Sequence, residues 1–362
     1  MKTSLIEKLN LALPIVQAPM AGVSTPAMAA AVSNAGALGS IAIGAMDVKV
    51  ARETILATRQ LTNHSFNVNV FCHRPAVLDA ARENSWLGIL ASLFAQFKAQ
   101  PPQHLKEIYT SFLDDDEMLE LLLELRIQVV SFHFGLPSAV KIARLKKAGV
   151  VLLATATNLD EAREIAAAGI DAIVAQGYEA GGHRGVFEPS QPDRCLGLSA
   201  LVRLLVTNLD IPVIAAGGIM DGAGISACLA LGAQAAQLGT AFINCPESSA
   251  DAHYRAALRS EAAFTTVMTS AISGRPARCL ANSFTKFGES IGSAEIPDYP
   301  LAYDAGKALH AAAKACGDGS YGAQWAGQGA PLARTLPAAE LVARLAEEMR
   351  NCGPGNSISS GL

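Results

Sequence analysis

Charged residues are scarce in this sequence, and no long run of lysine or arginine occurs. Only 17% of the 362 residues are Asp, Glu, Lys or Arg, and the formal net charge is -4. Nucleic acids and anionic membrane surfaces are usually bound by clustered basic residues, so neither is an expected partner. A hydrophobic share of 51% is enough for a large core. We therefore expect a globular protein that acts on a small molecule.

The sequence also lacks paired cysteines. Its seven cysteines are scattered, odd in number and never spaced as CxxC, which argues against a disulfide framework and against a zinc site. A reducing cytoplasm is the expected location. Near the N-terminus, Glu7 and Lys8 interrupt the apolar residues, whereas a secretory signal needs an uncharged apolar core.

One uncharged stretch, residues 222–246, is long enough to cross a bilayer, which takes roughly 20 residues. It contains Gly, Ser, Gln and Asn, and Gly232 divides it, so a membrane helix is disfavoured. We predict a buried helix over 223–231 and a buried strand over 235–242.

Continuous apolar runs recur along the chain, with helix-like segments between them. Such runs are typical of strands that are buried on both faces of a parallel sheet. Alternation of this kind eight times over predicts a TIM-type (β/α)8 barrel, and the strand count decides against the alternative, an open doubly wound sheet. The runs are 15–20, 38–43, 66–71, 129–134, 150–155, 172–175, 213–216 and 236–242.

Several of the intervening segments carry helix boundaries. Residues 158–168 begin with Asn158 as a cap and have Glu161 at the third helical position. Residues 25–35 and 137–148 are each followed by a glycine, which commonly ends a helix.

Two segments are longer than barrel loops require: 72–126, between the third and fourth strands, and 244–336, after the eighth. Insertions at the carboxyl ends of strands lie over the barrel mouth, where active sites sit, so both are candidate lids. The acidic run 114–117 in the first is explained as the favourably charged start of a helix rather than as a metal site. The predicted organisation is a barrel over 1–243 with the insertion 72–126, a helical cap over the C-terminal face (244–336), a C-terminal helix (337–352) and a flexible tail (353–362).

Glycines follow two of the predicted strands. Gly217 and Gly218 end the seventh strand and Gly239 ends the eighth. TIM barrels commonly hold a phosphate at these two places, on backbone N–H groups. Either motif alone is explained equally well as a simple turn, but together they favour a phosphate.

Two histidines lie at strand ends. His133 shares a strand face with Ser131 and Val129, and if that face is interior its imidazole lies at the barrel mouth. A lone histidine there is commonly a hydrogen-bonded core residue. His183, in the glycine-rich segment AQGYEAGGHRG after the sixth strand, brings a second titratable group to the same opening and favours function.

Polar side chains occur at two further places. Asn69 ends the third strand, where its amide could bind a planar ring or simply cap a turn. Residues 298–307 predict a helix with Pro300 in its first turn. Tyr299, Tyr303 and Lys307 are spaced four apart, so they would line one helix face and suit a small organic anion; a solvated face is the alternative.

Several catalytic motifs are absent from the sequence. It has no HExxH, no serine nucleophile elbow and no Walker loop. The lack of GxGxxG after a first strand disfavours an NAD-binding Rossmann domain. A metal site at His133 and His183 would lack an obvious third ligand, so no metal is expected.

Together these motifs resemble those of the class I nitronate monooxygenases, formerly called 2-nitropropane dioxygenases. The resemblance spans about residues 10–310 and is specific as a combination, since single motifs also occur in related flavin and nucleotide barrels. It rests on QAPMAG (17–22), FNVNVF (66–71), SFHFGLP (131–137), AQGYEAGGHRG (175–185), AAGGI (215–219), AQLGTAF (236–242) and YPLAYDAGK (299–307).

The resemblance implies a TIM barrel that holds FMN noncovalently and uses O2 to oxidise an alkyl nitronate to a carbonyl compound and nitrite, through a flavin semiquinone. Propionate 3-nitronate is the substrate usually associated with this class. By motif, His133 and His183 would face the substrate, and Tyr109, Tyr299, Tyr303 and Lys307 would close the pocket. The flavin and its phosphate would be held by Pro19, Met20, Ala21, Gly22, Asn69, Gln176, Gly181, Gly182, Gly217, Gly218, Gln237, Gly239 and Thr240. Tyr178, Glu179 and Arg184 would position the loop.

Rival functions stay open at this point. An NAD(P)H-dependent flavin reductase, of quinone or enoyl reductase type, would use the same barrel. A cofactor-free barrel isomerase or lyase acting on a phosphorylated sugar is a second rival, and a non-catalytic flavin-binding protein is a third. The expected partners are a nitronate and O2, and a homo-oligomer is compatible with the sequence.

Overall fold

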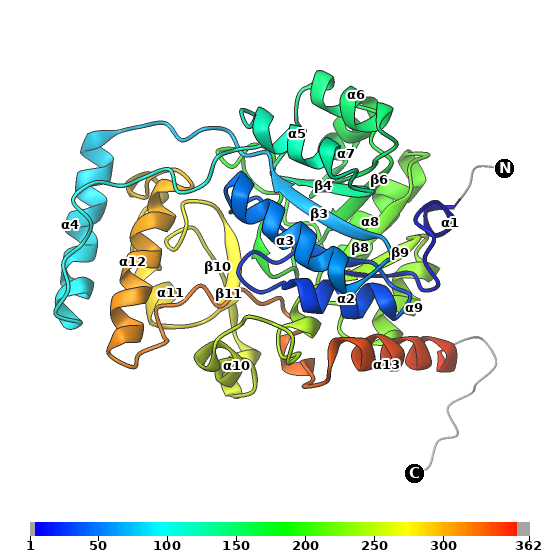
Figure 1. The fold of residues 1–362 in the computed structure, drawn as a ribbon. Coiled ribbons are helices and arrows are strands. Elements are labelled where there is room, and N and C mark those ends of the chain that lie inside the picture. Colours follow the sequence, from blue (N-terminus) through cyan, green and yellow to red (C-terminus); the bar gives the residue numbers. More distant parts are fainter. Residues whose placement is uncertain (1–3, 353–362) are drawn as a thin grey trace, which may run out of the picture.

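The computed structural model describes residues 4–352, and its centre is an eight-stranded parallel sheet in the order β1-β9-β8-β6-β5-β4-β3-β2 (Figure 1). The sheet closes between its first and last strands, because Gln17 N donates to Leu38 O and Leu38 N donates to Ile15 O, each at 2.9 Å. The predicted TIM-type barrel is confirmed. Its strands are β1 (Ile15–Gln17), β2 (Gly39–Ala42), β3 (Phe66–Phe71), β4 (Val129–His133), β5 (Val151–Ala156), β6 (Ala172–Gln176), β8 (Val213–Ala216) and β9 (Ala235–Leu238).

A helix follows each barrel strand and covers the outside of the sheet (Figure 1). The last of them, α13, packs against α9 and α2, and its Glu348 carboxylate accepts a hydrogen bond of 3.0 Å from Gly222 N at the start of α9. The C-terminal helix therefore completes the barrel. These helices are α2 (Pro26–Asn34), α3 (Val48–Leu61), α5 (Asp116–Glu124), α6 (Ala139–Lys147), α7 (Leu159–Ala167), α8 (Leu198–Asn208), α9 (Gly222–Ala230) and α13 (Ala338–Asn351).

Local signals place most element boundaries correctly, with two differences. Asn158 caps α7 as predicted. In a capping box the Glu161 carboxylate would accept a hydrogen bond from Asn158 N, but here it accepts from Thr157 N at 2.6 Å. The prediction of a strand as far as Phe242 is wrong: β9 ends at Leu238, because the chain turns at Gly239 into a short 3-10 helix.

Side chains alternate between the barrel interior and the helix layer. Val130 and Phe132 of β4 pack against the surrounding helices, whereas Val129 lies in the interior cluster with strand residues of the other side. The predicted shared face of Val129, Ser131 and His133 is therefore the interior face. A short helix, α1 (Leu5–Lys8), adds Leu5 to the interior cluster at the end of the barrel away from the strand carboxyl ends.

Two segments far apart in the sequence build one cap. α4 (Ala80–Gln96) comes from the insertion after β3, and α12 (Leu301–Ala315) from the segment after β9; they lie side by side beyond the barrel (Figure 1). Trp86 and Phe94 of α4 share a core with Leu309 of α12. α5 covers β3 as a barrel helix, so residues 72–115 are the part of the predicted insertion that leaves the barrel.

The segment 244–336 is not entirely helical. Besides α10 (Ala252–Leu258), α11 (Ser283–Gly288) and α12, it contains the antiparallel strands β10 (Thr266–Thr269) and β11 (Ala277–Leu280). β11 pairs with β7 (Gly182–His183), which belongs to the loop after β6. Neither strand was predicted, since their short runs include polar residues.

No helix in the described chain, residues 4–352, has the length and apolar character needed to cross a membrane. The uncharged stretch 222–246 forms α9 and β9 instead. The predicted flexible tail, 353–362, lies outside the described residues.

Candidate active site

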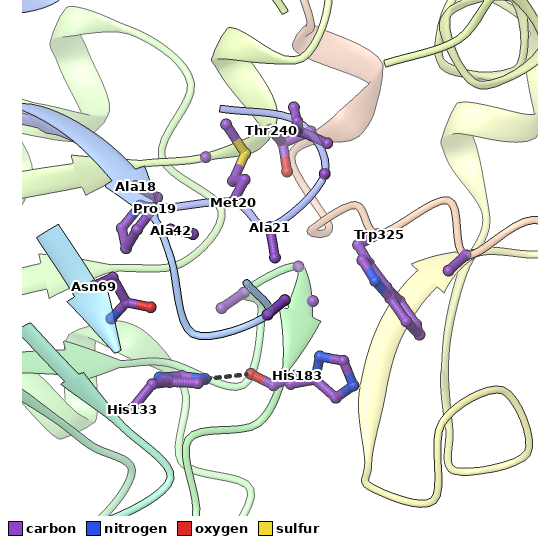
Figure 2. A pocket seen from close by; sticks show the side chains of 18 of the residues that line it. Ala18, Pro19, Met20, Ala21, Ala42, Asn69, His133, His183, Thr240 and Trp325 are labelled. Atoms are coloured by element: carbon purple, nitrogen blue, oxygen red, sulfur yellow. Dashed lines mark hydrogen bonds between the residues drawn. The ribbon is translucent and has the colours of Figure 1, made fainter. Parts of the chain in front are cut away.

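A cavity of about 640 Å³ lies at the carboxyl ends of the barrel strands, between the barrel and the cap. Figure 2 shows the loop after β1 crossing it, with Asn69 and His133 on the barrel side and Trp325 on the cap side. Every residue predicted for the site lines this cavity, so the fold brings together motifs from the whole chain. They are Pro19, Met20, Ala21, Gly22, Asn69, Tyr109, His133, Gln176, Gly181, Gly182, His183, Gly217, Gly218, Gln237, Gly239, Thr240, Tyr299, Tyr303 and Lys307.

One edge of the cavity is glycine backbone. Gly217 and Gly218 follow β8 with φ values of +138° and +67°, a region that side chains rarely adopt. A Cβ at Gly181 would lie 2.5 Å from Gly327 N, so a side chain there is excluded. Thr240 Oγ1 accepts from Gly327 N at 3.0 Å and ties the cap to this edge. Exposed backbone N–H groups and a hydroxyl fit a phosphate.

The barrel side of the cavity carries amide groups. Asn69 Nδ2 donates to Ser131 O at 3.1 Å and to Ser131 Oγ at 2.9 Å, and Asn69 Oδ1 forms no hydrogen bond within residues 4–352. Both polar atoms of the Gln176 amide already have partners. Its Nε2 donates to His183 O at 2.9 Å, and its Oε1 accepts from Gly185 N at 2.8 Å. Asn69 therefore offers a free acceptor to a bound ring, whereas Gln176 mainly holds the loop that follows it.

The loop after β6 is anchored by the residues expected to position it. Arg184 is buried, donates to Gln176 O at 3.1 Å and to Gly177 O at 3.0 Å, and pairs with Asp193 at 2.7 Å. The Glu179 carboxylate accepts from Leu198 N at 2.9 Å. The loop is thus a fixed structure rather than a loose turn.

His133 has both ring nitrogens occupied. Its Nε2 donates to His183 O at 3.3 Å (Figure 2), and its Nδ1 accepts from Thr155 Oγ1 at 3.0 Å. Burial lowers the pKa of the imidazole to about 4, so the ring is neutral at pH 7. In this arrangement His133 supports the backbone of His183.

His183 reaches further into the cavity. Its Nε2 lies 2.9 Å from Ser273 Oγ, and its ring is 5.0 Å from that of Trp325 and 5.5 Å from that of Tyr299. Burial, with a smaller contribution from His133, lowers the pKa of His183 to about 3. Nδ1 has no hydrogen-bond partner among the described residues, so this neutral imidazole has one nitrogen available to a ligand.

The Phe134 ring packs against three side chains at the His183 end of the cavity. Its ring lies 4.4 Å from that of His133, 5.5 Å from Tyr299 and 5.7 Å from His183. The backbone φ of Phe134 is +75°, which costs a bulky residue about 1–3 kcal/mol and is tolerated where the surroundings fix the ring.

The far end of the cavity is aromatic and cationic. The Lys307 Nζ lies 4.9 Å from the ring centre of Tyr109 and 5.2 Å from that of Tyr303. Burial lowers the pKa of Lys307. The predicted three-residue helix face is partly wrong: α12 begins at Leu301 after the cap residue Pro300, so Tyr299 reaches the cavity from the preceding turn.

Some cavity residues were not predicted. His310 and Lys314 continue the stripe of Tyr303 and Lys307 along α12, so helical spacing could have identified them. Trp325 lines the cavity from an irregular segment that had no periodic signal. Ser273, also in an irregular segment, is linked to the site only through His183 Nε2. Tyr254, on α10, likewise lines the cavity only through tertiary structure.

Comparisons with known proteins match this geometry. The nitronate monooxygenase family model covers residues 2–348. The chain belongs to the nitronate monooxygenase family. It is 62% identical to a nitronate monooxygenase of Paraburkholderia phytofirmans, and the match covers 96% of this chain and 95% of the relative. It is 56% identical to a nitronate monooxygenase of Pseudomonas aeruginosa, and that match covers 94% of this chain and 97% of the relative.

A solved structure also resembles this member of the nitronate monooxygenase family. The nitroalkane oxidase from Streptomyces ansochromogenes has a TM-score of 0.87 and 41% identity, covering 97% of this chain and 99% of that one. The match therefore covers both the barrel and the cap.

Proposed function

We propose that this protein is an FMN-dependent enzyme that uses O2 to oxidise alkyl nitronates, including propionate 3-nitronate, to a carbonyl compound and nitrite. The observation that carries the proposal is that one cavity at the barrel mouth combines a glycine edge suited to phosphate with a neutral histidine, tyrosines and a lysine. Membership of the nitronate monooxygenase family supports it.

The cavity fits FMN by the chemistry of its walls. The backbone after β8 and β9, with Gly217, Gly218 and Thr240, would hold the phosphate. Pro19 and Met20 lie against the cavity in the loop after β1, and the free Asn69 Oδ1 would accept a hydrogen bond from the ring system. FMN, when bound, supplies the redox chemistry.

The substrate end is suited to an anion that needs no strong base. A nitronate is already deprotonated at carbon, so its negative oxygens need hydrogen-bond donors and positive charge. His183 Nδ1 would orient the nitronate, and His133 would keep the His183 backbone in place through its 3.3 Å hydrogen bond. Lys307 would attract the carboxylate tail of propionate 3-nitronate, with Tyr109, Tyr299 and Tyr303 closing the pocket.

The visible spectrum of the purified protein, recorded without oxygen before and after addition of propionate 3-nitronate, tests cofactor and donor together. We expect a flavin spectrum that the nitronate changes and that NADH leaves unaltered. Bleaching by NADH instead would favour a flavin reductase. A colourless protein would favour an isomerase or lyase, and a yellow protein inert to both donors would favour a binding protein.

We further propose that the protein works in the cytoplasm, on the basis of its scattered, unpaired cysteines. The division into a barrel (1–243), a cap (244–336) and a C-terminal helix is a proposal about roles. The barrel, without the insertion 72–115, would hold FMN, and the cap, together with that insertion, would enclose the substrate. A homo-oligomer stays a prediction.

A further inference from the structure

Arg275 is a buried cation with no carboxylate in ion-pair contact within residues 4–352; Glu188 and Glu161 act on its charge only through space. It lies just before β11, is 4% exposed, and its guanidinium forms no ion pair with a carboxylate anywhere in residues 4–352. One Nη donates to Val186 O, while Nε has no hydrogen-bond partner in the same part of the chain. A charge buried in this way is costly and calls for a functional explanation.

The guanidinium stacks on the ring that organises the substrate end of the cavity. Arg275 Cζ lies 4.3 Å from the centre of the Phe134 ring. Phe134 in turn contacts His133, His183 and Tyr299, and its left-handed backbone conformation presents the ring to all of them. One aromatic ring therefore separates a permanent positive charge from the site of His183.

The charge of Arg275 shifts the pKa values of the titratable groups around it. Burial chiefly lowers the pKa of His183, His133 and His73, and in each case the positive charge of Arg275 lowers it further. Burial raises the pKa of Tyr299, and Arg275 opposes that rise. The pKa of Arg275 itself falls to about 10 through burial, so the guanidinium stays charged at neutral pH.

Two other buried arginines differ in what they face. Arg184 is paired with Asp193 at 2.7 Å, and its charge lowers the pKa of His133 less than that of Arg275 does. Arg278 is as buried as Arg275, but it donates to Tyr178 O at 2.9 Å and stacks on the Tyr178 ring, and it affects the pKa of none of those three histidines. Among these three, only Arg275 combines the lack of an ion pair within residues 4–352 with a place behind Phe134 at the substrate end.

We propose that Arg275 is an anion-selectivity residue: from behind Phe134 it sets a positive potential at the substrate end, so that the site binds anionic nitronates in preference to neutral nitroalkanes. The proposal deepens the proposed function and rests on it for the identity of the anion. Arg275 does not line the cavity, so it acts through space and not by contact.

The test measures binding of an inert pair to the FMN-loaded protein by calorimetry at pH 7.5. Butanoate carries a planar, delocalised anion like that of a nitronate, and butanamide is its neutral counterpart. Arg275→Gln keeps a donor for Val186 O but removes the charge. We expect it to weaken butanoate binding about tenfold and to change butanamide binding less than twofold.

Two further variants distinguish charge from structure. Arg275→Lys keeps the charge and should keep the preference for butanoate, whereas Arg278→Gln, the matched control, should leave the ratio of the two affinities unchanged. Equal weakening of both ligands by Arg275→Gln, or no change in either, would overturn the proposal. If the glutamine variant does not fold, the lysine variant decides: a retained preference supports the proposal, and a lost preference overturns it.

These outcomes are separate from those of the proposed function. Calorimetry with butanoate requires no turnover, so the selectivity of Arg275 can hold even if propionate 3-nitronate proves not to be oxidised. Conversely, normal oxidation of the nitronate by Arg275→Gln with unchanged KM would reject the role of Arg275 and leave the proposed activity intact.

Discussion

At the scale of single residues, His183 lines the cavity with a ring nitrogen, Nδ1, that has no hydrogen-bond partner within residues 4–352. Ser273 Oγ, 2.9 Å from its Nε2, fixes the ring, and burial keeps it neutral by lowering its pKa to about 3. A neutral imidazole can donate to or accept from a nitronate oxygen according to its tautomer. Its contribution is therefore to orient the substrate, with proton abstraction needed only for a neutral nitroalkane.

His183→Asn should lower kcat for ethyl nitronate roughly 100-fold, because a positioned hydrogen-bonding partner is lost. Nitrite release measures the rate, and the flavin spectrum of the purified variant checks that FMN is retained. His64→Asn, at an exposed position before β3, is the matched control and should leave kcat unchanged. Unchanged turnover by an FMN-loaded His183→Asn would refute this role.

Lys307→Met should raise KM for propionate 3-nitronate about tenfold more than KM for ethyl nitronate, since only the former has a carboxylate tail for the ammonium to attract. Steady-state kinetics with both substrates measure the difference. Lys314→Met is the control on the same helix, because its ammonium is already paired with Asp251 at 2.8 Å. Equal effects of Lys307→Met on the two substrates would reject the assignment.

At the scale of elements, α12 forms one wall of the cavity. Gly306 lies between the cavity-lining residues Tyr303 and Lys307, and a Cβ at this position would be 2.4 Å from Ile272 O. The helix can approach the backbone of the cap closely only because this residue has no side chain. Its position thus depends on a contact that helix propensity does not reveal.

Gly306→Ala should displace α12 and raise KM for nitronates several-fold, and the overpacking should cost about 1–3 kcal/mol although alanine favours helices. Kinetics and denaturant unfolding measure the two effects. Gly88→Ala, in the exposed middle of α4 with nothing within 4 Å of the new Cβ, should instead stabilise by about 0.5–1 kcal/mol. A stabilised Gly306→Ala with unchanged KM would contradict this view of α12.

At the scale of the whole molecule, buried histidines link stability to pH. In the unfolded chain a histidine takes up a proton near pH 6.5. In the folded protein burial lowers the pKa of His73 and His133 to about 4 and that of His183 to about 3. Between these values the unfolded state binds more protons, so the folded state loses stability as the pH falls.

The free energy of unfolding should therefore be unaffected by these groups above pH 7 and should fall between pH 6.5 and 5, by up to about 1.4 kcal/mol per pH unit for each histidine. Urea unfolding at several pH values measures the slope. His73→Gln, which removes one fully buried imidazole, should make it shallower. A slope of zero in this window would show that the three rings are protonated in the fold.

Much of this architecture follows from local sequence. The apolar runs become the barrel strands, and Asn158 caps its helix as expected, because burial on both faces and end-capping leave a pattern within a few residues. The glycine-bearing strand ends lie together because the carboxyl ends of all barrel strands meet at one face. Strand order alone therefore assembles most of the predicted site.

The tertiary structure decided what no local pattern records. It brings α4 and α12 together as one cap, pairs β11 with the loop of His183, and occupies both nitrogens of His133. It also places Arg275 behind Phe134 with no carboxylate in ion-pair contact among residues 4–352. The sequence by itself determined the elements and which of their ends carry reactive groups, because these depend on neighbours in the chain. Which groups are free, neutral or charged depends on contacts between distant residues, and only folding sets those.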